Sequence, residues 1–161
     1  MPNYKIDTYL KIVLFISLFS LISAFFIEYI LGHQPCNLCL LERIPYGLSI
    51  LLIIIDYIFK VNKKFLVLLL ILLFTFSFSI SVYHYGIEEG YFNESTICEI
   101  KNFANIISKE EILEQLSKKV ISCKDVTFRI FGLSLTSINM FLSLILTVIL
   151  TYIFTNYDKI K

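Results

Sequence analysis

Four long runs of apolar residues divide the chain, and most polar residues lie between them. The runs cover about residues 10–31, 44–59, 65–83 and 133–154. A helix needs about 20 apolar residues to cross a hydrocarbon core of about 30 Å, so the second run is short and would need interfacial residues at its ends. Backbone groups inside a bilayer must be hydrogen-bonded within the chain, which favours helices. The pattern therefore predicts an all-α membrane protein, a four-transmembrane-helix bundle formed as one domain over residues 1–161.

Composition supports this fold class and limits the partners. Hydrophobic residues make up 57% of the 161 positions, whereas soluble domains are usually about 45–50% apolar. The formal net charge is only +1, so the total charge gives no indication of nucleic acid. We expect membrane lipid and no nucleic acid as a partner.

Lysines predict the orientation of the bundle. They flank the first run, separate the second run from the third and follow the fourth, at Lys5, Lys11, Lys60, Lys63, Lys64, Lys159 and Lys161. The positive-inside rule places these flanks, and so both termini, in the cytoplasm. The loops at about residues 32–43 and 84–132 then face outward. All four cysteines lie in those loops or at their margins, as expected for thiols in an oxidising compartment such as a bacterial periplasm.

The second outward loop contains a helical pattern. In "SKEEILEQLSKKV", apolar residues recur at helical spacing, Ser108 is a candidate N-cap, and Glu111 follows three residues later. The pattern predicts a short amphipathic helix lying on the outer leaflet. A solvated helix packed against the spans is the alternative.

Candidate chemistry lies in "HQPCNLCLLER", residues 33–43, where Cys36 and Cys39 form a Cys-x-x-Cys motif. Such a motif can be structural, bind metal or exchange thiols for disulfides. Cys98 and Cys123 are too far apart in sequence to supply a second pair of zinc ligands, and we expect no metal site. A redox role has a physical basis, because the positive end of a helix dipole beside Cys36 and Cys39 favours a thiolate. Arg43 lies one turn after Cys39 and can stabilise the thiolate or an electron-rich acceptor.

The position of this motif suggests the electron acceptor. Disulfide exchange moves electron pairs between sulfurs but does not remove them. A reactive pair at the edge of a bilayer is well placed for an oxidant dissolved in lipid, and a membrane quinone is the obvious candidate.

At these residues the chain resembles the disulfide bond formation protein B (DsbB) family, quinone-dependent thiol oxidases of the bacterial inner membrane. The resemblance covers nearly the whole chain. It is carried by "PCNLCLLER" (35–43), "YHYGIEEGYF" (83–92), a lone cysteine at position 98 and "SCKDVTFRIFGLSL" (122–135). Phe128 and Phe131 stand near where some relatives have tryptophan, which leaves the membrane contact of this loop open.

The resemblance implies a role for each matching residue. Cys36 and Cys39 would be the quinone-coupled pair, with Cys39 facing the ring of ubiquinone or menaquinone. Cys98 and Cys123 would be a second pair, in which Cys98 forms the mixed disulfide with a periplasmic, DsbA-like thioredoxin-fold protein and Cys123 passes electrons to Cys36.

The same resemblance implies that two further residues contact the quinone. Arg43 would lie against the quinone and stabilise its reduced form. His84 would line the quinone pocket, although a histidine at a helix end is more often interfacial.

Two other functions remain as alternatives. One is a redox protein similar to vitamin K epoxide reductase, but such proteins place the Cys-x-x-Cys motif late in the chain, whereas here it precedes the second span. The other is a non-enzymatic membrane scaffold with structural disulfides, which predicts polar residues along the spans. The serines of the spans are better explained as helix-packing residues, and the spans carry almost no charge apart from Glu28 and Asp56, both near span ends.

Overall fold

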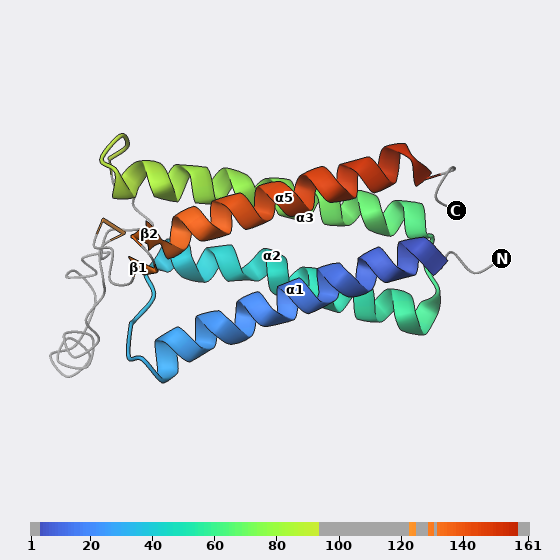
Figure 1. Ribbon diagram of the computed structural model, residues 1–161, viewed down its shortest axis with the longest axis horizontal. Coiled ribbons are helices and arrows are strands. Elements are labelled where there is room, and N and C mark those ends of the chain that lie inside the picture. Colours follow the sequence, from blue (N-terminus) through green and yellow to red (C-terminus); the bar gives the residue numbers. More distant parts are fainter. Residues whose placement is uncertain (1–3, 94–122, 125–128, 131, 158–161) are drawn as a thin grey trace, which may run out of the picture.

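The described part of the chain contains four long helices, and each is long and apolar enough to cross a membrane. The computed structural model describes residues 4–93, 123–124, 129–130 and 132–157. The helices are α1 (Tyr4–Tyr29), α2 (Asn37–Phe59), α3 (Lys63–Glu88) and α5 (Leu135–Thr155). They run along one common axis, and α1 begins at the end of the bundle where α5 ends (Figure 1). The predicted four-helix membrane bundle is confirmed.

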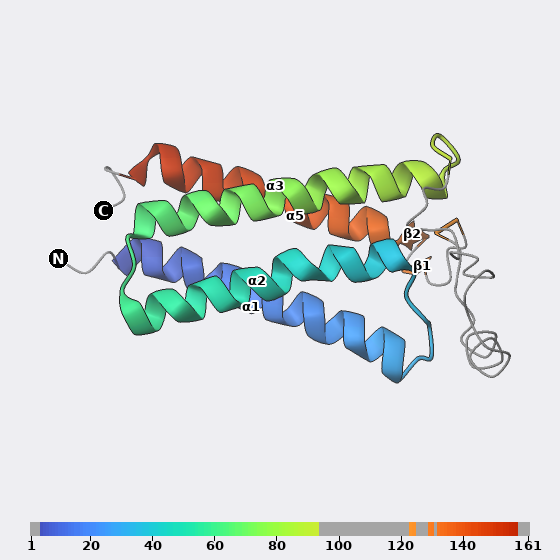
Figure 2. The same cartoon turned by 180° about the vertical axis from the view of Figure 1, so that it is seen from behind.

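Helix packing determines which ends of the chain meet. α3 packs most extensively against α5, and α2 packs against both α1 and α3. Seen from behind, α2 and α3 lie in front, with the loop after α1 leading into the start of α2 (Figure 2). We call the end of the bundle that carries Cys36, Cys39 and Cys123 the cysteine end, and the opposite end, where α1 begins and α5 ends, the terminal end.

Two helix boundaries differ from the predicted ones in ways that affect the site. α2 begins at Asn37, ahead of its apolar run near residue 44, and continues through Pro45. Proline is tolerated inside membrane helices because neighbouring groups satisfy the freed backbone. The expected helix start beside Cys36 and Cys39 is confirmed, with Cys36 as the N-cap. α3 extends to Glu88 rather than ending near residue 83, which places His84 inside the bundle.

A small hairpin, which the apolar pattern did not predict, leads into α5. Strands β1 (Arg129–Ile130) and β2 (Leu133–Ser134) pair antiparallel. Gly132 lies between them with a φ of 85°, a left-handed conformation that glycine adopts without steric cost. Ser134 then caps α5, because its side chain accepts a hydrogen bond from the backbone N–H of Ser137 at 3.2 Å. The fourth helix therefore begins at Leu135, two residues later than predicted. The predicted amphipathic helix near Ser108 lies outside the described residues.

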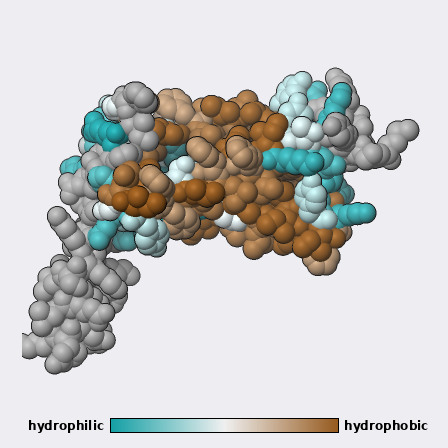
Figure 3. All heavy atoms as spheres, turned by 60° about the horizontal axis from the view of Figure 1, so that its bottom comes forward, coloured by the Kyte–Doolittle hydropathy of each residue, from teal (hydrophilic) through white to brown (hydrophobic). Residues whose placement is uncertain are grey.

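On the face shown in Figure 3, an apolar belt covers the middle of the bundle, and hydrophilic residues gather towards its two ends. The belt includes exposed side chains such as Phe15, Phe19 and Ile145, as expected for a surface that faces lipid. Inside, small polar residues connect the helices: the hydroxyl of Ser49 on α2 donates to Ser17 on α1 at 2.9 Å. This contact supports a packing role for the serines of the spans.

The terminal end is held together by an ion-pair cluster. The amino group of Lys63, at the start of α3, lies 2.6 Å from a carboxylate oxygen of Asp56 on α2 and 2.7 Å from one of Asp7 on α1. Only 1% of the Asp56 side chain is exposed. A buried carboxylate needs such a partner, since an unpaired charge there is very costly.

Candidate active site

The Cys-x-x-Cys motif lies at the first turn of α2, at the cysteine end of the bundle. Cys36 is the N-cap, and its sulfur accepts a hydrogen bond from the backbone N–H of Cys39 at 3.3 Å. Both residues are free cysteines, with their Sγ atoms 2.7 Å apart. Two thiolates on one tetrahedral zinc ion would lie about 3.8 Å apart, given zinc–sulfur bonds of about 2.3 Å. The spacing therefore suits formation of a disulfide within the pair better than shared coordination of zinc.

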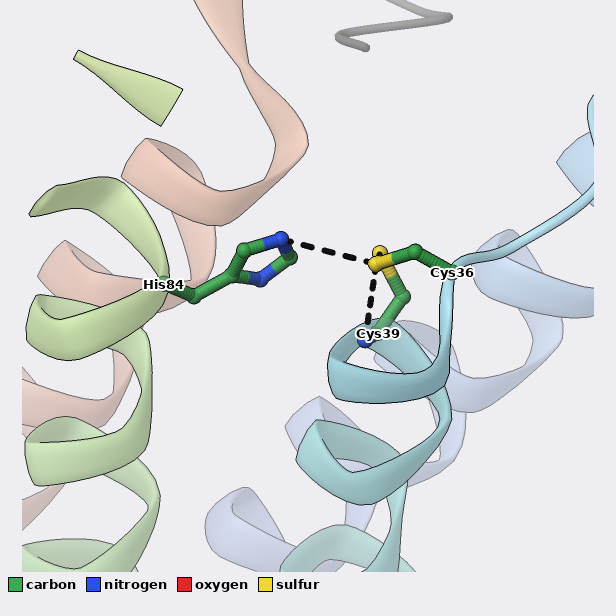
Figure 4. Close-up of side chains that lie close together, drawn as sticks. All are labelled: Cys36, Cys39 and His84. Atoms are coloured by element: carbon green, nitrogen blue, oxygen red, sulfur yellow. Dashed lines mark hydrogen bonds between the residues drawn. The ribbon is translucent and has the colours of Figure 1, made fainter. Parts of the chain in front are cut away.

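His84 of α3 points at this pair from across the bundle (Figure 4). Its Nε2 lies 3.5 Å from the Cys36 sulfur, and only 1% of the residue is exposed. The alternative of an interfacial histidine at a helix end is therefore wrong. The reason is that α3 continues for another turn beyond His84, so the ring lies within the packed bundle.

Glu42 is the partner of that imidazole. One carboxylate oxygen lies 3.0 Å from Nδ1 of His84, and the other accepts a hydrogen bond from the side-chain amide of Asn139 on α5 at 3.0 Å. Only 7% of the residue is exposed. Glu42 therefore points inward from α2 onto α3 and α5.

The surroundings of Cys36 favour its thiolate. The contact with the side chain of Cys39, assisted by His84, lowers the pKa of Cys36 from 9.0 to about 4 against the opposing effect of burial. A sulfur at the positive end of a helix, facing both an N–H group and an imidazole, is the arrangement that produces reactive cysteines.

Arg43 points towards α1. Its guanidinium forms an ion pair with Glu28 and lies over the ring of Phe25, 5.2 Å from its centroid. The charge is thereby held at the wall of the cavity described below rather than beside the sulfur of Cys39.

A polar network continues from His84 to α5 and to the end of α3. Thr136 lies 3.3 Å from Nδ1 of His84 and donates a hydrogen bond to Glu88 at 2.6 Å. Asn139 also donates to Ser81 at 2.7 Å. The sequence patterns did not indicate Thr136, Asn139 or Glu88 as site residues. Glu88 could have been identified by its spacing, since it follows His84 by four residues and so shares its helix face.

A cavity of about 550 Å³ adjoins these groups. Its lining includes apolar side chains of α1 and α5, such as Phe15, Phe19 and Leu142. It also includes the groups of the site, namely Cys36, Cys39, Glu42, Arg43, His84, Glu88 and Thr136. The volume is in the usual range for a small-molecule site, about 300–1,000 Å³, and the cavity can take a flat, largely apolar ligand against the two sulfurs.

Of the remaining two cysteines, only Cys123 lies among the described residues. Cys123 is disulfide-bonded, only 2% exposed, and belongs to the same buried cluster as Cys36, Leu38 and Ile87. It also lines the cavity. Cys98 lies outside the described residues. The structure thus brings together five of the six predicted site residues: Cys36, Cys39, Arg43, His84 and Cys123.

Comparison with known proteins identifies the family. The model of the disulfide bond formation protein DsbB family matches residues 7–153. The chain is also 32% identical over 154 residues to uncharacterized protein RP370 of Rickettsia prowazekii (strain Madrid E), covering 92% of this chain and 90% of that protein. No solved structure matches the chain significantly. A match over nearly the whole chain, joined to a free cysteine pair at a helix tip, shows that this multi-pass membrane protein belongs to the DsbB family of disulfide bond formation proteins.

Proposed function

We propose that this protein is a quinone-reducing thiol oxidase that reoxidises a soluble, DsbA-like thioredoxin-fold protein. The observation that carries the proposal is the cavity, whose lining combines Cys36 and Cys39 with apolar side chains of α1 and α5. A quinone has an apolar ring and two carbonyl oxygens, so it suits a pocket that combines aromatic side chains with a few polar groups. When bound, it supplies the acceptor for an electron pair and two protons.

Electrons would enter through the second cysteine pair. Cys98 would form the mixed disulfide with the soluble partner, and Cys123 would hand the electron pair to Cys36 by disulfide exchange. The burial of Cys123 in one cluster with Cys36 supports this order. Cys39 would then face the quinone ring, and Arg43 would hold a ring oxygen by its charge. The quinone would be ubiquinone or menaquinone.

The cysteines would lie on the periplasmic side of a bacterial inner membrane, with both termini in the cytoplasm. The lysine clusters that flank the terminal end support this orientation. It is tested in intact cells with a membrane-impermeant maleimide after mild reduction. The orientation would be wrong if Cys36 or Cys123 reacted only when the reagent was given access to the cytosol.

The test of the activity uses the full chain in lipid nanodiscs. Quinone absorbance is followed with decylubiquinone or menadione as acceptor and a reduced DsbA-type protein as donor. We expect turnover with wild type and none with Cys39→Ser. If the serine variant reduced quinone at the wild-type rate, or if wild type reduced neither quinone, the proposal would be wrong.

Two further variants separate the steps. Arg43→Ala should raise the apparent KM for quinone by about tenfold or more, since loss of one charge-assisted hydrogen bond costs about 1.5–3 kcal/mol. It should leave reduction of the Cys36–Cys39 disulfide by dithiothreitol unchanged. Cys123→Ser should trap a mixed disulfide between Cys98 and the soluble partner, visible on a non-reducing gel. Trapping through Cys36 instead would overturn the assigned order of the cysteines.

A further inference from the structure

Glu88 is a buried acid with one oxygen unaccounted for. Its side chain is only 7% exposed, and one oxygen, Oε1, accepts the hydroxyl of Thr136 at 2.6 Å. The other oxygen, Oε2, is buried and has no hydrogen-bond partner among the described residues. Buried polar atoms are nearly always paired, so an orphaned one calls for a ligand or a function. Glu88 lines the cavity, where such a ligand would lie.

The hydrogen-bond directions indicate where a proton on Glu88 would be. If Nδ1 of His84 carries a hydrogen, it donates to Glu42 at 3.0 Å and to Thr136 at 3.3 Å. Thr136 in turn donates to Oε1 of Glu88, so Oε1 acts as an acceptor. A proton on Glu88 would therefore lie on Oε2, the oxygen without a partner.

Glu88 and Glu42 share one neighbour. The imidazole of His84 lies 3.0 Å from Glu42 through Nδ1 and 3.9 Å from Glu88 through Nε2. The same ring therefore connects both carboxyl groups. The other titratable groups around the cavity are Glu28 on α1, His33 in the following loop, Cys36, and Cys39, Arg43 and Tyr46 on α2. Arg43 is already paired with Glu28.

The same contacts form a path from the sulfurs to Glu88. Sγ of Cys39 lies 2.7 Å from that of Cys36, which lies 3.5 Å from Nε2 of His84. That nitrogen is 3.9 Å from Oε1 of Glu88. The two contacts that involve sulfur are within hydrogen-bonding distance, whereas the Glu88 carboxyl must turn towards His84 before it can take up a proton from the ring.

We propose that Glu88 is the general acid of the proposed reaction, giving a proton from Oε2 to a ring oxygen of the bound quinone, and that His84 reloads it with protons from the cysteine pair. This inference rests on the proposed function. In total, the S–H bond of Cys39 breaks, one S–S bond forms between Cys36 and Cys39, and the quinone gains the electron pair and two protons. One of these protons comes from Cys39, and the other is the proton that His84 holds beside the thiolate of Cys36.

The test compares two neighbouring carboxyl groups. Glu88→Gln keeps the shape and a hydrogen-bond donor but has no proton to transfer, and Glu89→Gln is the matched control because Glu89 is exposed at the C-cap of α3. The full chain in nanodiscs is first reduced, and oxidation of its cysteine pair by decylubiquinone is followed in a single turnover across a range of pH. Binding of decylubiquinone to the oxidised chain is measured separately by equilibrium dialysis.

We expect Glu88→Gln to slow oxidation by quinone about 10²–10⁴-fold, the usual effect of losing a general acid. Its quinone affinity and its oxidation by oxidised glutathione should match those of wild type, since neither needs a proton delivered to the ring. The pH dependence of the wild-type rate should be lost. Glu88→Asp keeps an acid and should recover part of the rate with its pH dependence, and Glu89→Gln should behave as wild type.

Several results would overturn the inference and leave the proposed function standing. One is oxidation of Glu88→Gln by decylubiquinone at the wild-type rate. Another is an equal loss of rate in Glu89→Gln. A third is a loss of rate in Glu88→Gln that is fully explained by weaker quinone binding. Slow oxidation by glutathione as well would indicate a structural role for Glu88 instead. If wild type itself reduced no quinone, the proposed function would fail.

Discussion

Each end of the bundle buries a carboxylate between helices, but the two ends neutralise it differently. At the terminal end, Asp56 meets the amino group of Lys63 at 2.6 Å. At the cysteine end, Glu42 meets the imidazole of His84 at 3.0 Å. A lysine holds its proton under ordinary conditions, whereas an imidazole exchanges one readily near neutral pH. The first pair can therefore only fasten helices together, and the second can also move a proton.

The surroundings of the two pairs differ accordingly. Lys63 also contacts Asp7, so one cation joins α1, α2 and α3. His84 instead contacts a sulfur, a hydroxyl and two carboxyl groups, and it lines a cavity. A cluster in which one lysine is paired with two carboxylates stabilises helix packing and offers no proton to a reaction. A cluster of several weak acids around one imidazole, beside a space for a ligand, has the arrangement expected of a reaction site.

The largest expected effect tests the imidazole at the cysteine end. Replacing His84 with leucine removes the ring nitrogen that faces Cys36, so the pKa of Cys36 should rise from about 4 towards its ordinary value of 9.0. Because a lowered pKa favours the thiolate, reduced wild type should keep its ultraviolet thiolate absorbance down to about pH 4, and the variant should lose it at higher pH. Cys36→Ser supplies the baseline. Equal titration curves for wild type and variant would contradict this role.

The matching change at the terminal end should affect stability and not chemistry. Lys63→Met leaves Asp56 buried without its cation, which should lower the free energy of unfolding by about 3–5 kcal/mol. Denaturation in mixed detergent micelles measures this loss, and the thiolate titration of Cys36 should stay as in wild type. Replacing both residues, as Asp56→Leu with Lys63→Met, should restore most of the stability. A shifted titration in Lys63→Met would show that the two ends are coupled.

A smaller effect is expected at the turn that closes the cysteine end. A methyl group added at Gly86 would lie 2.3 Å from the ring of Phe92, which stacks on Tyr83. Gly86→Ala should therefore cost about 1–3 kcal/mol by overpacking, measured by thermal unfolding. Gly47→Ala is the control, since nothing lies within 4 Å of its added carbon, and it should be neutral or stabilising. Rescue of Gly86→Ala by Phe92→Leu would confirm the cause, and equal stability of the two alanine variants would refute it.

The smallest effect concerns the middle of the bundle, between the two ends. Ser49→Ala removes the interhelical hydrogen bond to Ser17 and should cost about 0.6 kcal/mol, an average value for such bonds in membranes. Ser79→Ala is the control, because Ser79 is exposed and bonds only to the backbone of Thr75 in its own helix. The two variants are compared by denaturation in the same micelles. A larger loss in Ser79→Ala would contradict the packing role of Ser49.

Much of the fold could be predicted from the sequence because hydrocarbon imposes a simple rule. Every buried backbone group must be satisfied within the chain, so long apolar runs become helices. The ends of the helices were less predictable. α2 begins before its apolar run because Cys36 caps it. α3 extends beyond its apolar run because His84 and Glu88 contact α5 and not lipid.

The sequence by itself determined the number of spans, the family resemblance and the placement of the Cys-x-x-Cys motif at a helix start, since each depends on local pattern alone. Only the tertiary structure decided that Glu42, His84, Thr136 and Glu88 meet beside the sulfurs. These residues come from three helices and lie up to 94 positions apart, 42 against 136. Their chemistry depends on side chains brought together by packing, and a polar residue near the end of an apolar run looks the same in sequence whether it faces water or a buried neighbour.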